Sequence, residues 1–192
     1  ERGAARRYSR GVTDSTWKLE PADGELTVLT GVAGPAAKMG HRLTIAMQSW
    51  HATVDWRGKA PGAVLLEVDV DSLQVLQGEG GVTPLSGPEK GIVRANALKS
   101  LDAKKFPKIR FTADDIAKTA GGYRLTGSVE IHGTSRPQVV DLAVGEDGGD
   151  WVMSAEVPVT QSDFKVKPYS LLMGTMKVAD EVTVRFSARH PK

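Results

Sequence analysis

The sequence predicts one all-β domain in which about eight antiparallel strands close into a barrel that carries one inserted α-helix. Three observations predict this fold: runs of alternating apolar residues recur along the chain, Gly, Pro, Asn or Asp separate them, and one stretch alone has helical periodicity. Short turns join most of the runs, so neighbouring strands are antiparallel. Closure into a barrel would leave no exposed strand edge.

The first predicted strands lie in the N-terminal third of the chain. Residues 24–30 form a short strand, and residues 31–40 are small and flexible with room for one short helical turn. Residues 42–56 form a long strand in which the apolar parity switches close to Gln48. One extra residue there would re-aim the strand, so we expect a bulge or bend. Pro61 predicts the turn that follows.

The middle of the chain predicts a strand, a loop and the helix. Residues 64–71 alternate as a strand does, and residues 78–87 form a polar, Gly-rich loop. Residues 88–103 form the helix, because Pro88 suits a first turn and apolar residues recur at three- and four-residue spacing. The apolar face of this helix is expected to consist of Ile92, Ala95, Leu98 and Leu101.

The remaining strands follow from period-two alternation and from the turn residues between them. They are expected at residues 108–113, 123–131, 138–144, 151–159 and 181–188. The turns fall at Gly121-Gly122, residues 133–137 and residues 147–150. Between the last two strands, residues 168–174 predict a short helix that could act as a lid.

Composition limits the function classes. The 192 residues carry 25 basic and 23 acidic side chains, so the balance gives no general case for binding nucleic acid. The locally basic residues 1–11 are expected to be a flexible arm, with contact to phosphates or lipid headgroups as the alternative. Residues 12–192 form the single domain.

The absence of cysteine excludes disulfides, thiol catalysis and thiolate metal sites. No apolar run reaches the roughly 20 residues that span a bilayer. The four His have no zinc-like spacing, and no nucleotide-binding Gly motif is present, so we expect neither metal nor cofactor. We expect a cytoplasmic location; a periplasmic or secreted one stays open because the chain begins at Glu and an upstream signal could have been removed.

Polar candidates for chemistry are few. His132 ends a strand before Gly133, where a structural turn residue is favoured over a catalytic base. Lys38, His41 and Arg42 could form a polar collar at the barrel mouth that suits a phosphate or other headgroup, or they could be an exposed loop end.

Apolar candidates are more numerous. Tyr169, Leu172, Met173 and Met176 cluster in the segment that could close over a flexible ligand, because Met adapts to irregular partners; ordinary packing of a short helix is the alternative. Four further residues could line the interior or fill it: Phe111, Tyr123, Leu125 and Trp151.

Four segments together resemble one family. They read KSLDAKKFPKIRFTA (residues 99–113), YRLTGSVEIHGTSRPQVVDL (123–142), VTQSDFKV (159–166) and DEVTVRF (180–186). In this order they are similar to the YceI-like family over about residues 25–189. Two departures indicate an atypical sub-branch: the opening GVAGPAAKMGHRLTIAM (31–47), and Lys165 where the family's Ser-Asp-Phe turn usually continues with Gly.

The resemblance implies a lipocalin-like barrel with an elongated apolar cavity that binds a polyisoprenoid or similar long-chain molecule, with Phe164 of the Ser-Asp-Phe turn added to the candidate ligand contacts. The expected function is carriage or sequestration of that ligand, with a homodimer as a further possibility. The alternative is an isomerase or cyclase acting on a hydrophobic metabolite in the same cavity; it would need His132, His41 or Tyr123 as its proton donor or acceptor.

Overall fold

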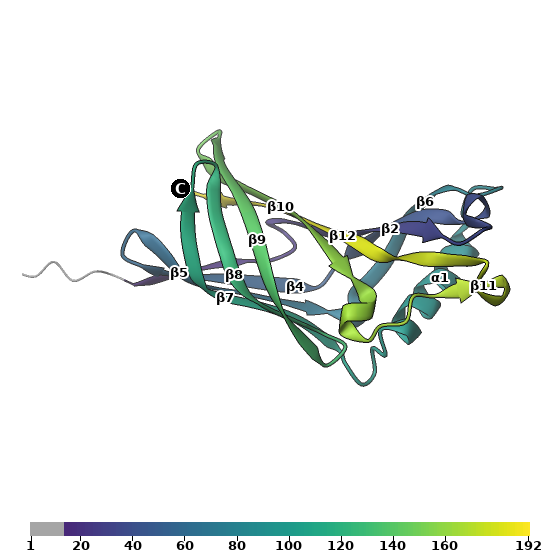
Figure 1. Ribbon diagram of the computed structural model, residues 1–192. Coiled ribbons are helices and arrows are strands. Elements are labelled where there is room, and N and C mark those ends of the chain that lie inside the picture. The colour runs from purple at the N-terminus through teal and green to yellow at the C-terminus, as the bar shows by residue number, and fades with distance from the viewer. Residues whose placement is uncertain (1–13) are drawn as a thin grey trace, which may run out of the picture.

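The computed structural model describes residues 14–192, and Figure 1 shows an elongated β-structure with its helix near one end. The basic arm expected at residues 1–11 lies outside the described residues. Twelve strands form: β1 (Ser15–Leu19), β2 (Gly24–Ala33), β3 (His41–Met47), β4 (Trp50–Arg57), β5 (Ala60–Asp69), β6 (Leu73–Gly80), β7 (Lys108–Thr119), β8 (Gly122–Ile131), β9 (Thr134–Asp147), β10 (Asp150–Thr160), β11 (Ser170–Leu171) and β12 (Met176–Pro191).

All strand pairs are antiparallel, which confirms the predicted all-β fold. The pairing path runs β1-β4-β5-β7-β8-β9-β10-β12-β2-β3-β6, and β11 pairs with β12 beside it. This path wraps as a half-barrel and is open, since no pairing within residues 14–192 joins β1 to β6. The closed barrel of about eight strands is therefore not confirmed, and the strand count is twelve.

The higher count has a local cause, because long strands are interrupted by bends. Only Gln48 and Ser49 separate β3 from β4, so the bend predicted from the parity switch is confirmed. The partner strand bends at the same level, where one 3-10 turn (Val70–Ser72) separates β5 from β6. The bends align: the Gln48 N–H donates to the Ser72 carbonyl at 3.3 Å, and the Asp69 N–H donates to the Ser49 carbonyl at 2.9 Å.

Two predicted turns are wrong. Residues 134–137, expected in a turn, lie in β9, and the chain reverses at His132-Gly133 because Ile131 pairs with Thr134. Pro61 lies inside β5, opposite Trp56, and the chain reverses instead at Gly58, whose φ of 67° a residue with a Cβ rarely adopts. A register shift beside Trp56 marks a bulge, a position where a strand tolerates Pro. The β9–β10 turn at residues 147–150 is confirmed, with Gly148 and Gly149 both at positive φ.

The helix α1 (Gly87–Ser100) begins at a capping box that the prediction overlooked. The Ser86 hydroxyl accepts the Glu89 N–H at 3.3 Å, and the Glu89 carboxylate accepts the Ser86 N–H at 2.6 Å. Its inner face is rotated from the predicted one. Val93, Ala97, Leu98 and Leu101 pack on the core, whereas Ile92 is 63% exposed and Ala95 is exposed.

Strands β1 and β6 were missed because neither has a long alternating run of apolar residues. The core nevertheless depends on both, since it includes Leu19 of β1 and Leu73 and Val75 of β6. Trp50 belongs to this core, is 4% exposed, and packs with Phe186 in a T-shaped arrangement at 5.6 Å between ring centroids.

Candidate functional site

One hollow of the molecule, here called the inner cavity, has a volume of about 190 Å³. Its walls are formed by the helix α1, the segment after β10 and seven strands: β2, β3, β6, β7, β8, β10 and β12. Most of the wall is aliphatic: Val28, Leu43, Ile45, Val93, Ala97 and Val184 are typical lining residues. An apolar cavity of this size resists water and accepts an apolar guest.

Five polar side chains reach this wall, and two are committed to the protein backbone. The Thr30 hydroxyl accepts the Leu43 N–H at 3.0 Å, and the Gln161 amide donates to the Ala179 carbonyl at 3.0 Å. Asn96, Ser100 and Tyr169 are the other three. Asn96 and Ser100 lie one helical turn apart on α1, so both present polar atoms to the same part of the cavity.

A second hollow, here called the aromatic cavity, has a volume of about 210 Å³ and a different wall. Trp17, Trp56, Tyr123 and Trp151 line it together with aliphatic residues of β5, β8 and β9. The Trp17 ring lies 4.7 Å from the Trp56 ring and stacks on His190 at 4.1 Å. Packing among these rings fixes the wall at the end of the molecule where both described chain termini lie (Figure 1).

A packed layer separates the two cavities. Along the bent β3–β4 segment, Met47 lines the inner cavity, Val54 lines the aromatic cavity, and buried Trp50 lies between them. On β8, Val129 lies in the same way between Ile131 and Leu125. The apolar interior is thus divided in two by side chains.

The predicted site residues therefore divide into groups. Phe164 and Tyr169 line the inner cavity, whereas Tyr123, Leu125 and Trp151 line the aromatic one. Phe111 is 8% exposed and fills the core beside Leu125 and Val129, lining neither. The structure brings together only the members within each group.

Apart from Tyr169, the predicted collar and lid residues lie away from both cavity walls. The short helix expected at residues 168–174 is instead β11 followed by a 3-10 turn (Leu172–Gly174). The His41 Nε2 contacts the Thr83 carbonyl at 2.7 Å, Arg42 reaches Glu79 at 4.0 Å, and Lys38 is exposed. Residues Leu172 and Met173 are 59% and 104% exposed, so they point outward. Met176 packs beside Gly40, where its sulfur would lie 3.2 Å from an added Cβ.

The structural interpretation of His132 is confirmed by its contacts. Its Nδ1 lies 3.2 Å from the Phe164 carbonyl, its ring packs on Phe106 at 4.7 Å, and its backbone takes φ 53°. Arg136 donates to the Asp163 carbonyl at 2.9 Å. His132 and Arg136 together tie the β8–β9 hairpin to the segment carrying Phe164, and so position one wall of the inner cavity.

The Ser-Asp-Phe turn is a 3-10 turn (Gln161–Phe164) that ends on a left-handed residue. Lys165, where the resembled family usually has Gly, has φ 58° and ψ 21°. The Ser162 hydroxyl and N–H both donate to the Asp180 carboxylate of β12. This link holds the turn against β12, which is also a cavity wall.

The ion pairs among the described residues join side chains that are partly exposed to solvent. Arg110 hydrogen-bonds the Glu67 carboxylate and lowers its pKa, and Lys108 and Ser49 do the same for Asp69. Within residues 14–192 no three His, Asp or Glu side chains are grouped to hold a metal ion. None of the described helices is both long and apolar enough to cross a bilayer.

The residues that sequence reasoning missed are Asn96 and Ser100; their spacing from Val93 and Ala97 would have placed them on the inner face.

Comparison with known proteins agrees with this geometry. The profile of the YceI-like domain matches residues 17–190. The crystal structure of Burkholderia cenocepacia BcnA is similar at a TM-score of 0.67 and 19% identity, covering 90% of this chain and 99% of that chain. A Campylobacter jejuni YceI protein is similar at 0.51 and 14%, covering 100% and 91%. No curated protein sequence matches significantly.

Proposed function

Since this chain belongs to the YceI-like family, whose lipocalin-like fold binds apolar ligands, we propose that it holds a polyisoprenoid or similar long-chain molecule in the inner cavity and carries or sequesters it. The observation that supports this most is the cavity itself: about 190 Å³, walled by aliphatic side chains from seven strands and one helix. Such a wall favours a hydrocarbon chain over any charged substrate.

We also propose that the sheet surrounds this ligand as a closed barrel. Counted as single bent strands, β3–β4 and β5–β6 each continue across their bends, where backbone hydrogen bonds join the two segments. The first then pairs with β2 through β3 and with β5 through β4. On that count the path from β5 through β12 and β2 returns to β5, which supports eight strands around one interior.

The helix α1 supplies the polar side chains that could hydrogen-bond the polar end of the ligand. The Asn96 amide offers two donors and an acceptor, and the Ser100 hydroxyl offers one donor, so either can bind a neutral oxygen. Lys38 and Arg42, which are exposed, remain candidates for contacting a charged headgroup outside the cavity. Only five side chains on the cavity wall are polar, so most of the binding affinity would come from burial of the ligand's apolar surface.

The test is a chain-length series. Burial contributes about 0.8 kcal/mol per methylene, so each added five-carbon unit stabilises the complex by roughly 4 kcal/mol until the cavity is full. We expect affinity for prenyl alcohols to rise steeply with length and then level off. Native mass spectrometry of gently purified protein, followed by lipid extraction, would identify any ligand already bound.

A matched pair of variants locates the ligand. Ala97→Trp places an indole into the inner cavity from α1, whereas Ala95→Trp places the same group on the exposed face of that helix. We expect Ala97→Trp to abolish prenyl binding and Ala95→Trp to leave it unchanged. Protein that is purified empty and binds no prenyl chain would refute the proposal.

A further inference from the structure

Three loops meet at the end of the molecule farthest from the aromatic cavity (Figure 1, right). The Ala36 N–H donates to the Thr175 carbonyl at 2.8 Å, which joins the loop after β2 to the loop before β12. His41 pairs with Gly80 across β3 and β6, and its ring contacts the Thr83 carbonyl at 2.7 Å. The loop after β6 therefore lies at the same end.

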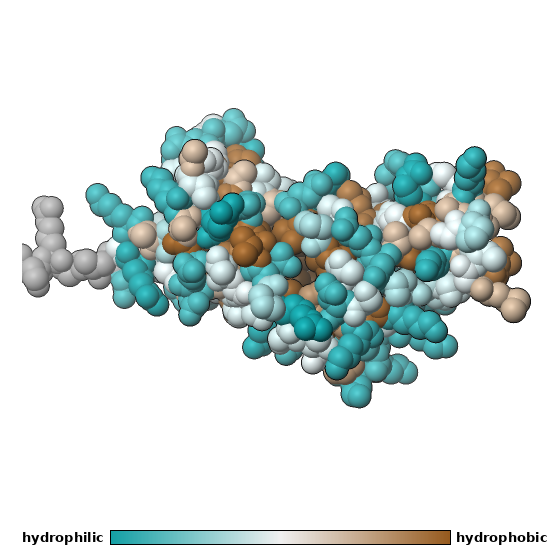
Figure 2. All heavy atoms as spheres, viewed as in Figure 1, coloured by the Kyte–Doolittle hydropathy of each residue, from teal (hydrophilic) through white to brown (hydrophobic). Residues whose placement is uncertain are grey.

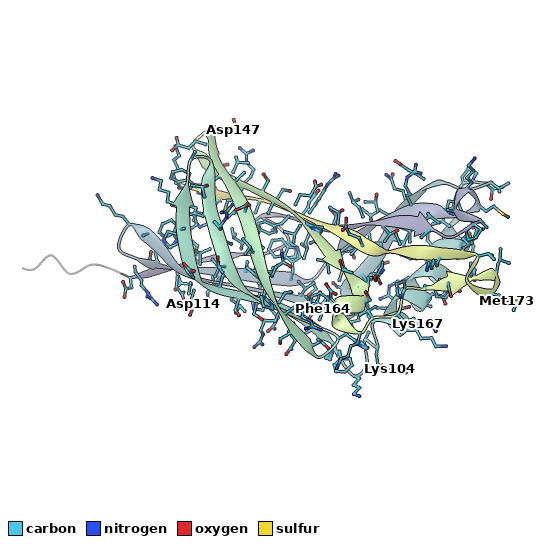
Figure 3. All side chains as sticks on the ribbon, viewed as in Figure 1. Lys104, Asp114, Asp147, Phe164, Lys167 and Met173 are labelled. Atoms are coloured by element: carbon cyan, nitrogen blue, oxygen red, sulfur yellow. The ribbon has the colours of Figure 1, made fainter. Side chains whose placement is uncertain are left out.

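These loops carry an unusual number of exposed apolar side chains. The described residues include eight large hydrophobic side chains that are exposed, and five of these belong to the three loops or their flanks. We call this group the apolar tip; it consists of Met39, Val82, Leu171, Leu172 and Met173. Apolar side chains appear at the right-hand end in Figure 2, and Figure 3 shows Met173 at the outermost point.

The backbone holds two of these side chains outward in a disfavoured conformation. Leu172 and Met173 have φ of 51° and 57°, followed by Gly174 at 88°. Left-handed backbone is unfavourable for residues with a Cβ, and two in succession need local support. The Thr175 hydroxyl supplies part of it by donating to the Leu172 carbonyl at 2.8 Å. The loop therefore presents both side chains outward in spite of the cost of this backbone conformation.

Basic side chains surround the apolar tip. Lys38 lies next to Met39 in the 3-10 turn η1 (Ala37–Met39), and Arg42 follows that turn by three residues. Lys177 follows the loop that carries Met173. All three basic side chains are exposed. Glu79 offsets only Arg42, at 4.0 Å. An apolar projection with a cationic rim matches the acyl and headgroup layers of an anionic bilayer.

We propose that the apolar tip docks this protein onto an anionic lipid surface. Exposed apolar patches on a folded domain mark interaction sites, and this one projects from the end of the molecule rather than forming a groove (Figure 2), which fits a lipid layer. Tyr169 and Val178, which line the inner cavity, lie only a few residues from the tip. Docking would therefore place that cavity beside the membrane, and it requires no particular ligand inside the protein.

The absence of cysteine allows a direct test. Met173→Cys and Val139→Cys each introduce a single thiol for an environment-sensitive fluorophore; Val139 is 47% exposed on β9, away from the tip. With vesicles of phosphatidylcholine containing phosphatidylglycerol, we expect a blue shift at position 173 and none at position 139. Equal shifts at the two positions, or no shift at either, would overturn the proposal.

Sedimentation with the same vesicles measures affinity. Leu172→Ser combined with Met173→Ser should lower the partition coefficient at least about tenfold, whereas Val139→Ser should not change it. Lys38→Gln and Lys177→Gln should each cost about fivefold, and only with phosphatidylglycerol present. Near-UV circular dichroism checks that each variant is folded. A tip-dependent dimer in ultracentrifugation without vesicle binding would contradict the proposal, since the partner would then be a second copy.

Discussion

Truncating Trp50 tests whether the packed layer between the two cavities both stabilises the fold and limits the ligand. Trp50 is 4% exposed and packs with Phe186 in a T-shaped pair whose ring centroids are 5.6 Å apart. A buried aromatic ring removes about 200 Å² from water, which at roughly 25 cal/mol per Å² is worth about 5 kcal/mol. Trp50→Ala adds a void to cavities already present on both sides, so little collapse can offset the loss.

We therefore expect Trp50→Ala to lower the free energy of unfolding by about 3–5 kcal/mol. For a chain of this length that corresponds to a fall in Tm of roughly 6–20 °C. Urea unfolding with tryptophan-independent detection by far-UV circular dichroism measures the change. Trp50→Phe, which keeps a ring in the layer, is the matched control and should lose less than half as much.

The same variant should change which ligands bind. Removing the indole connects the inner cavity of about 190 Å³ with the aromatic cavity of about 210 Å³. The chain length at which prenyl affinity levels off should then increase by at least one five-carbon unit. A loss of stability below about 1 kcal/mol together with an unchanged length limit would refute the idea that this side chain divides the interior.

Three further predictions concern the turn, the outer face and the helix. Lys165→Gly should stabilise the protein by about 1 kcal/mol, measured by thermal unfolding, because Gly relieves the left-handed backbone at φ 58°; no change would contradict this. The pKa values of Glu67 and Asp69 are lowered from 4.5 and 3.8 by Arg110 and by Lys108 with Ser49 respectively, so stability should be full above about pH 4.5 and decline as the pH falls through the lowered values. Acid titration of Glu67→Gln should show a shallower decline, with less than about 1 kcal/mol lost at neutral pH. Arg94 donates to the Leu73 and Asp71 carbonyls at 2.7 and 2.5 Å, so Arg94→Ala should speed ligand release several-fold in stopped flow by loosening α1; an unchanged rate would exclude α1 as the moving wall.

The strands were largely predictable because alternation reports which face of a strand is apolar. The bend at Gln48 was also predictable, since it changes that parity within one run. Strands β1 and β6 were not predictable, because neither has a clear alternation of apolar residues. Each is stabilised by pairing with a neighbouring strand, β1 with β4 and β6 with β3. The helix face was misplaced at Ile92 because its propensity and spacing allowed two faces, and only contact with β6 selects between them.

The site itself was harder to predict, for a physical reason. Alternation identifies side chains that point inward, but whether an interior is hollow depends on the sizes of residues that meet across it. Trp50 and Phe186, which are 136 positions apart, meet and fill the middle. At the level of Val28, Ala97 and Val184 the facing residues are smaller, and space remains. The cavity is thus set by pairs of residues remote in sequence. Reading it from one chain requires the register of every strand first, together with the rotation of α1, which brings Asn96 and Ser100 rather than Ile92 to the wall.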